Sequence, residues 1–320
     1  MSCVELQHLG AAVGEQFDFA IFSGSYDKRA LSCATAIGSG RYKNAIVAWN
    51  KNHQEYNADN FNALWKLCGS SQVFECSLDS NNPVKTADSF MTVFRSVGVS
   101  RATSVLVDVT AFTREALAIL LLILKLTVSS SCRVVIVYNA AKHYSSGGAG
   151  LWLSAGIREV RSVLGYSGAL IPAKPSHLIV LPGYEHERAS ELIASYEPLR
   201  LSLGRVSKSE SISSDFYDLH LQFLESLAAV YESSKVSFFA FSAKDLSGTK
   251  AAVLRQAELH RDCNPVVACL NSKLAMVGTC LACFQNEELQ LCYAQPEKYN
   301  VAEFSEASDF AYVEEISGFQ

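Results

Sequence analysis

The sequence predicts an α/β fold of two tandem Rossmann-like domains, each with a parallel sheet, related by internal duplication. Strand-like and helix-like segments alternate along the chain, which is typical of βαβ units. The strand-like segments are mostly continuous apolar runs, as expected when both faces of a parallel sheet are covered. Matching residues also recur at matching spacings in the two halves.

The predicted first half covers residues 1–145. Its strands are expected at 17–22, 45–49, 73–78, 105–109 and 134–138, and its helices at 28–37, 60–67, 86–97 and from 114 onward. Thr110 and Thr113 can cap the last of these helices. Residues 146–172 begin with a Gly- and Ser-rich stretch and are predicted to connect the halves.

The predicted second half covers residues 173–320 and repeats the order. Its strands are expected at 177–181, 201–203, 236–241, 265–270 and 289–293, and its helices at 187–196, 217–230, 249–260 and 274–284. The last twenty residues are acidic and are expected to hold one short strand, 310–313.

The repeat rests on three spacings that both halves share. The spacing from Gly24 to Arg29 equals that from Gly183 to Arg188, and the spacing from Gly24 to Arg114 equals that from Gly183 to Lys273. The spacing from Tyr138 to Tyr144 equals that from Tyr293 to Tyr299. Several markers in one register indicate a duplicated Rossmann-like domain.

Composition excludes some functions. The 320 residues carry a net charge of -5, which argues against general DNA binding. The start, MSCVELQHLG, lacks the pattern of a signal peptide, and the apolar run 116–124 is too short to cross a bilayer. We expect a cytoplasmic protein with reduced thiols and no membrane partner. Cys280 and Cys283 form a CxxC, but it falls in an apolar helical pattern, so neither a metal site nor a cofactor is predicted.

Ligands of open α/β sheets bind at the carboxyl ends of the strands, where the repeated residues fall. Cations beside helix N-termini there favour phosphate or carboxylate. The candidate ligand-binding residues are Gly24, Arg29, Thr110, Thr113, Arg114, Tyr138, Gly183, Arg188, Lys273 and Tyr293.

Structural roles remain open for these residues. Arg29 and Arg188 can instead pair with Asp27, Glu185 or Glu187, and Arg114 with Asp108 or Glu115. The glycines suit tight turns, and the tyrosines suit core or rim packing.

Two carboxylates are candidates for catalysis. Asp108 lies in an apolar strand and needs partners, so it is either a hydrogen-bonded turn anchor or a site acid. Asp27 adjoins Arg29 and is the second candidate acid or base. No GxGxxG, GxSxG or P-loop motif accompanies them.

Residues 107–116, VDVTAFTREA, resemble the Asn-x-Thr-Gly-Gly-Thr-Lys strand-turn-helix motif of CRISPR-associated Rossmann-fold (CARF) sensor domains. Asp108 takes the Asn position, and Thr110, Thr113 and Arg114 take the Thr, Thr and Lys positions. Ala111 and Phe112 depart from the two glycines. The two fused halves are similar to the SAVED domains of bacterial antiviral systems.

The resemblance implies a non-catalytic sensor that binds a cyclic oligonucleotide, or another phosphate-bearing nucleotide, between two pseudo-symmetric halves and signals through a separate effector protein in antiviral defence. Two other functions stay open. One is an enzyme that processes a nucleotide or sugar phosphate with Asp108 or Asp27. The other is a scaffold or adaptor subunit in which the repeat is architectural.

Overall fold

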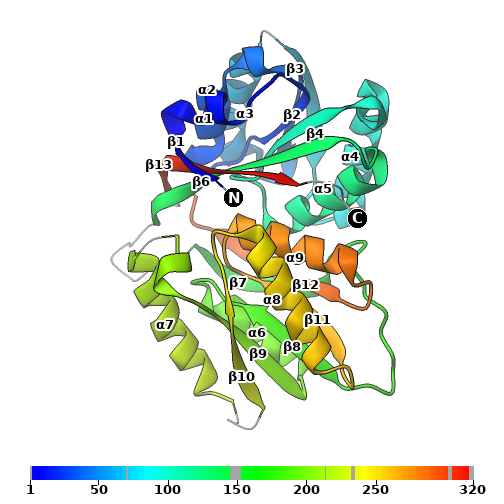
Figure 1. Ribbon diagram of the computed structural model, residues 1–320, viewed down its shortest axis with the longest axis vertical. Helices are drawn as coiled ribbons and strands as arrows, with labels where there is room; N and C mark the ends of the chain where they lie inside the picture. Colours follow the sequence, from blue (N-terminus) through cyan, green and yellow to red (C-terminus); the bar gives the residue numbers. More distant parts are fainter. Residues whose placement is uncertain are drawn as a thin grey trace. The chain divides into compact units, whose positions relative to one another are not determined.

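The computed structural model describes residues 2–69, 71–144, 153–212, 214–231, 235–301 and 305–316. The chain divides into two compact units, each built on one mixed sheet (Figure 1). Unit 1 comprises Met1–Tyr144 and Val301–Gln320, and unit 2 comprises Ser145–Asn300. The predicted fold class, two Rossmann-like α/β domains, is confirmed.

The sheet of unit 1 has the order β1-β13-β6-β5-β2-β3-β4. Its parallel strands are β2 (Phe17–Ser23), β3 (Tyr42–Asn50), β4 (Gln72–Leu78), β5 (Ser104–Asp108) and β6 (Arg133–Tyr144). β13 (Ser305–Ile316) pairs antiparallel with β6, and β1 (Ser2–Glu5) pairs antiparallel with β13. The first parallel strand is therefore central, and the strand order reverses between β2 and β5, as in Rossmann folds.

Both faces of this sheet are covered (Figure 1). α1 (Leu9–Ala12), α2 (Ser32–Ile37) and α3 (Gln54–Leu67) contribute to one core cluster with side chains such as Ala20 and Phe22 of β2. α4 (Pro83–Val97) and α5 (Arg114–Thr127) lie against the other face. Because side chains alternate along a strand, the neighbouring buried Ile21 faces this second layer. A sheet buried on both faces explains the apolar strands of the sequence.

Unit 2 repeats the order as β10-β9-β8-β11-β12-β7. Its strands are β7 (Ser154–Ser162), β8 (Ser176–Leu181), β9 (Arg200–Val206), β10 (Val236–Phe241), β11 (Asn264–Cys269) and β12 (Gln290–Tyr299), and its helices are α6 (His186–Tyr196), α7 (Ser214–Ala228), α8 (Leu246–Leu259) and α9 (Lys273–Gln285). β7 pairs antiparallel with β12, and the other pairs are parallel. The shared order of five parallel strands agrees with the predicted duplication.

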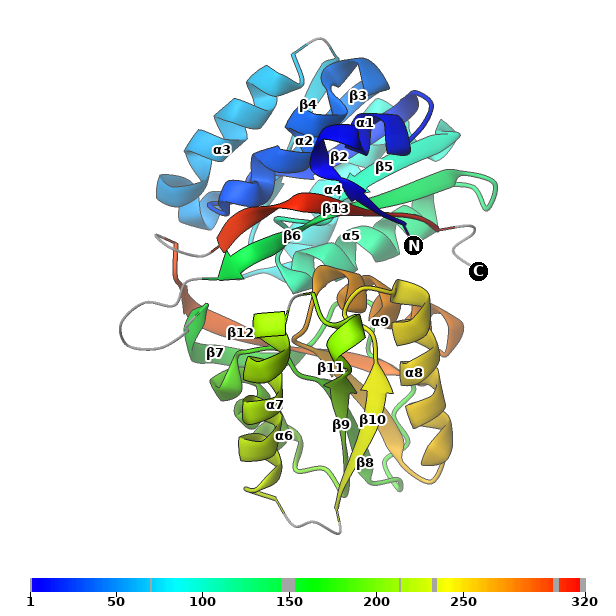
Figure 2. The same cartoon turned by 60° about the vertical axis from the view of Figure 1, so that its left-hand side comes forward.

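The predicted domain boundaries differ from the two units. Residues 154–162 of the predicted connector form β7, an edge strand of unit 2, whereas β13 near the C-terminal end completes the sheet of unit 1 (Figure 2). Residues 146–152 of that connector lie outside the described residues. Each long fifth strand thus pairs with an antiparallel strand that does not directly follow it in the chain.

Other elements also differ from the sequence prediction. Residues 2–12, which we left unassigned, form β1, a 3-10 turn and α1, and residues 28–37 form a 3-10 turn followed by the short α2. β6, β12 and β13 are longer than predicted because each continues through polar residues that the apolar pattern omits. The 3-10 helices are Leu6–His8, Lys28–Leu31, Ser39–Arg41, Lys51–His53, Val99–Arg101 and Lys208–Glu210.

Corresponding caps begin α5 and α9. The Thr113 hydroxyl accepts a hydrogen bond from the Ala116 N–H at 3.2 Å, and the Ser272 hydroxyl accepts one from the Ala275 N–H at 3.0 Å. Both satisfy N–H groups that a first helical turn leaves without partners. The predicted cap at Thr113 is therefore confirmed.

Both apolar helices are largely buried. Cys280 and Cys283 lie in α9, and burial raises the pKa of both thiols, so they behave as small apolar residues. In the described part of the chain, no helix is both long and apolar enough to cross a membrane.

Candidate functional site

Arg29 follows β2 and is enclosed by polar groups of unit 1. Its guanidinium is 2% exposed, and its Nη2 lies 2.7 Å from Oδ2 of Asp27. Nε also donates to Asp27, and Nη1 donates to the Asn139 carbonyl of β6 at 3.2 Å. The Ser305 hydroxyl of β13 donates to Oδ1 of Asp27 at 2.9 Å. A buried ion pair therefore links β2, β6 and the antiparallel strand β13.

Arg188 has a closely related environment in unit 2. It is also 2% exposed, and its Nη1 donates to Oε2 of Glu185 at 2.9 Å. Nε donates to the Ala294 carbonyl of β12 at 3.0 Å, and the Ser154 hydroxyl of β7 donates to Glu185. We call each arrangement of arginine, carboxylate and strand serine a latch. Both latches hold the antiparallel strand of their unit.

The latches decide between the two interpretations of these arginines. Arg29 and Arg188 are paired with Asp27 and Glu185, so the ion-pair interpretation is confirmed. Burial acts to raise the pKa of Asp27, but the charge and hydrogen bonds of Arg29 outweigh it and hold the pKa below its ordinary value. Asp27 is ionised at neutral pH, which suits a structural carboxylate rather than a catalytic acid.

Asp108 ends β5 inside a buried polar cluster. It is 2% exposed, and burial raises its pKa to about 6, against the opposing effect of hydrogen bonds from Thr110. The Thr110 N–H donates to Oδ1 of Asp108 at 3.0 Å, and the Thr110 hydroxyl accepts from the Asn139 N–H at 3.0 Å. The Cys33 thiol lies 3.7 Å from the same hydroxyl. Asp108 is therefore a hydrogen-bonded turn anchor that titrates near neutral pH.

The predicted tyrosines are buried. Tyr138 stacks on Tyr312 with ring centroids 6.3 Å apart, which is the packing role left open above. The Tyr293 ring lies 5.1 Å from the Arg188 guanidinium, and its hydroxyl lies 3.2 Å from that of Tyr299. The structure thus places Tyr293 beside a predicted cation, but Tyr138 in the strand packing.

The predicted glycines permit close backbone approach. A Cβ atom on Gly24 would lie 2.8 Å from Cα of Phe61, and one on Gly183 would lie 2.1 Å from the Leu270 carbonyl oxygen. Neither position accommodates a side chain without movement of the backbone. Arg114 and Lys273 are partly exposed first residues of α5 and α9, as expected from the cap pattern.

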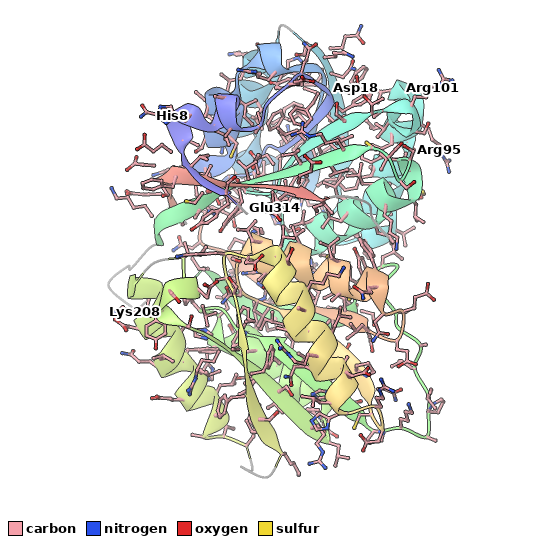
Figure 3. The ribbon with its side chains drawn as sticks, viewed as in Figure 1. His8, Asp18, Arg95, Arg101, Lys208 and Glu314 are labelled. Carbon is pink, nitrogen blue, oxygen red and sulfur yellow. The ribbon has the colours of Figure 1, made fainter. Side chains whose placement is uncertain are left out.

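Charged groups at the amino-terminal edge of the unit 1 sheet have a structural role. Asp18 of β2, labelled in Figure 3, accepts hydrogen bonds from Nζ of Lys43 at 2.7 Å and from the Thr103 N–H at 2.8 Å. These bonds lower the pKa of Asp18 to about 2, with the Lys43 bond as the largest cause. They tie β2 to β3 and to the turn before β5.

An open groove lies at the carboxyl ends of β3 and β4 in unit 1, beside the first turns of α4. Its volume is about 540 Å³, and its lining comprises Lys51, Asn52, Ser77, Leu78, Asp79, Lys85, Asp88, Ser89, Thr92 and Val93. None of these residues was among the sequence-based candidates, because they belong neither to the repeated register nor to the turn after residues 105–109. The available signal was the polar pair Lys51 and Asn52 after one strand and Asp79 after the next.

The groove brings both charge signs together. The Asn52 side-chain amide donates to Oδ1 of Asp79 at 2.8 Å, and Nζ of Lys85 lies 3.8 Å from Oδ2 of Asp79. Nζ of Lys51 lies 3.0 Å from Glu75. The Asn82 side chain caps α4 by accepting from the Lys85 N–H. Across the described ranges, no group of three or more His, Cys, Asp or Glu side chains is placed to hold a metal ion.

No protein-family model matches the chain. No curated protein matches it in sequence. Solved structures give weak likenesses. The tRNA methyltransferase TrmK of B. subtilis is 13% identical over 43% of this chain and 51% of its own, with a TM-score of 0.26, so the chain spans about half of that protein.

Two further structures are similarly distant. TrmN from Thermus thermophilus is 12% identical over 49% of this chain and 43% of its own, with a TM-score of 0.25. The N-domain of a bacterial malonyl-CoA reductase with NADP is 12% identical over 84% and 76%, with a TM-score of 0.24. Likenesses at this level do not assign an activity to the chain.

The expectation of a non-catalytic cyclic-oligonucleotide sensor is nevertheless corrected. Two of the four cations expected to face the ligand, Arg29 and Arg188, are instead buried in ion pairs. The resemblance at 107–116 stays an untested prediction.

Proposed function

We propose that the protein is an enzyme acting on a nucleotide or sugar phosphate, and that this ligand binds in the groove of unit 1. The observation that carries the proposal is the position of the groove beyond the carboxyl ends of β3 and β4, which is the edge of an open α/β sheet at which ligands bind. Lys51 and Lys85 supply positive charge for a phosphate, and Asp79 and Asp88 supply acceptors for hydroxyl groups.

The groove chemistry suits a ligand that carries both kinds of group. Asp79 is oriented by Asn52 and approached by Lys85, so its carboxylate is fixed relative to the start of α4. A sugar hydroxyl can donate a hydrogen bond to this carboxylate while the phosphate binds Lys51, Lys85 and the N-terminus of α4. A carboxylate held in this way can also accept a proton from a reacting hydroxyl.

The first test is binding. Thermal unfolding is followed with a panel of nucleotides and sugar phosphates, using wild type, the double variant Lys51→Glu/Lys85→Glu, and Lys66→Glu on α3 as a charge-reversal control away from the groove. A ligand at 100 times its Kd stabilises the native state by about 2.7 kcal/mol. The groove variant is expected to lose that gain and Lys66→Glu to keep it. An equal response in all three proteins would show that the ligand does not bind in the groove.

The second test is turnover. A ligand found by binding is incubated with wild type and Asp79→Asn, and its products are followed by phosphorus NMR. Binding retained with turnover lost in Asp79→Asn supports the enzyme. If wild type binds the ligand but does not convert it, the proposal that the protein is an enzyme is contradicted.

A scaffold or adaptor role is the second candidate, because the repeated arginines Arg29 and Arg188 both form structural ion pairs. A second groove of about 700 Å³ in unit 1 offers an apolar surface lined by Leu6, Leu31 and Phe310, the last 49% exposed. A protein that co-purifies in stoichiometric amount, and is lost in Phe310→Asp but retained in the other groove's double variant, favours this role.

A further inference from the structure

The two latches differ in how the nitrogen atoms of the guanidinium group are bonded, and above all in the partner of Nη2. In unit 1, Asp27 lies two residues before its arginine and accepts from both Nε and Nη2 of Arg29. In unit 2, Glu185 lies three residues before Arg188 and accepts from Nη1, while Nε donates to the Ala294 carbonyl. Among the residues that the structure describes, Nη2 of Arg188 has no hydrogen-bond acceptor.

A buried guanidinium N–H without an acceptor is unusual, because it bears the full desolvation penalty of a charged donor. The Tyr293 ring lies 5.1 Å from the guanidinium and gives a cation–π contact. A ring face satisfies a charged donor less well than an oxygen does. The position therefore lacks an oxygen acceptor that its counterpart in unit 1 has.

Two tyrosine hydroxyls belong to β12, the strand whose Tyr293 ring contacts this guanidinium. The hydroxyls of Tyr293 and Tyr299 lie 3.2 Å apart near the end of β12. Burial acts to lower the pKa of Arg188, but Glu185 and then the oxygens of these two tyrosines raise it above the ordinary value. Tyr299 is only partly buried.

We propose that Nη2 of Arg188, with the hydroxyls of Tyr293 and Tyr299, binds a small oxyanion group such as a phosphate or carboxylate. One oxygen of such a group accepts from Nη2, and another accepts from a phenolic hydroxyl. Charge-assisted bonds from a guanidinium are among the strongest that an oxyanion forms in a protein. The site lies in unit 2 and is independent of the groove in unit 1.

The test uses the full chain and two probes, sodium phosphate and sodium acetate, titrated against sodium chloride at constant ionic strength. The unfolding midpoint is measured for wild type, Arg188→Lys and the matched variant Arg29→Lys. Lysine keeps the positive charge but has no second amino group to offer the anion. The midpoint is expected to rise and saturate in wild type and Arg29→Lys, and to follow the chloride reference in Arg188→Lys.

Two further variants keep the test decisive. Tyr299→Phe removes one hydroxyl without touching the ion pair and is expected to weaken the response severalfold, even if Arg188→Lys does not fold. Lys51→Glu/Lys85→Glu is expected to respond as wild type does. A response to phosphate alone or to both probes supports the site and defines its anion. No response beyond chloride, or a response lost only in the groove variant, overturns it.

Discussion

Replacement of Asp108 by asparagine gives the sharpest test of the buried cluster at the end of β5. The folded carboxyl has a pKa of about 6, raised from 3.8 by burial. A raised pKa contributes stability that is fully present below the unfolded value and is lost as the pH rises through the folded value. At 1.36 kcal/mol per unit, the full shift corresponds to about 3 kcal/mol, and about 2 kcal/mol of it is lost between pH 4 and pH 7 because the unfolded carboxyl is already partly ionised at pH 4. An asparagine side chain does not titrate, so the variant escapes this loss.

The measured quantity is the free energy of unfolding of Asp108→Asn minus that of wild type, from urea titrations at pH 4, 5.5 and 7. We expect this difference to increase by about 2 kcal/mol over the range, whatever its value at pH 4. Asp27→Asn is the control that stays nearly constant over this range, because Arg29 holds the pKa of Asp27 below its ordinary value and the stability linked to it is lost only below about pH 4. A difference for Asp108→Asn that stays constant, or falls with pH, refutes the reasoning.

Two further predictions concern unit 2. Gly183→Ala is expected to lower the free energy of unfolding by about 1–3 kcal/mol, because its Cβ would lie 2.1 Å from the Leu270 carbonyl oxygen. Gly40 has open space around it, so Gly40→Ala is the control and is expected to change the free energy of unfolding little in the same urea titration. Burial, together with the charge of His260, lowers the pKa of His177 to about 4. The stability that the neutral imidazole contributes is therefore fully present above pH 6.5, and about 3 kcal/mol of the free energy of unfolding is lost as the pH falls to 4. His177→Gln is expected to lose less stability over that range, and identical pH profiles would contradict the assignment.

The parallel strands could be predicted from sequence because burial on both faces leaves a continuous apolar run. The antiparallel edge strands could not, since their partners are chosen by tertiary contacts. β7 and β13 carry polar residues along their length, and their local sequence does not determine which sheet they join. The duplication and the order of elements followed from the parallel strands alone.

The site was predictable only in part for a similar reason. The spacing of Arg29 from Asp27 allows both an internal ion pair and a free cation, and only the enclosure by Asn139 and Ser305 decides between them. The burial of Asp108 was expected, but the value of its pKa depends on Thr110 and Cys33, whose contacts with it form only in the folded chain. The groove was missed because its lysines do not belong to the repeated register.

The placement of β13 has a consequence for synthesis on the ribosome. Residues 1–144 emerge first, yet their sheet stays incomplete until β13 at residues 305–316 has been made. Unit 2 is continuous in the chain and can close beforehand. Meanwhile β6 presents an unpaired edge and Asp27 lacks the Ser305 hydroxyl. The part of the protein that is translated first is therefore the part that finishes folding last.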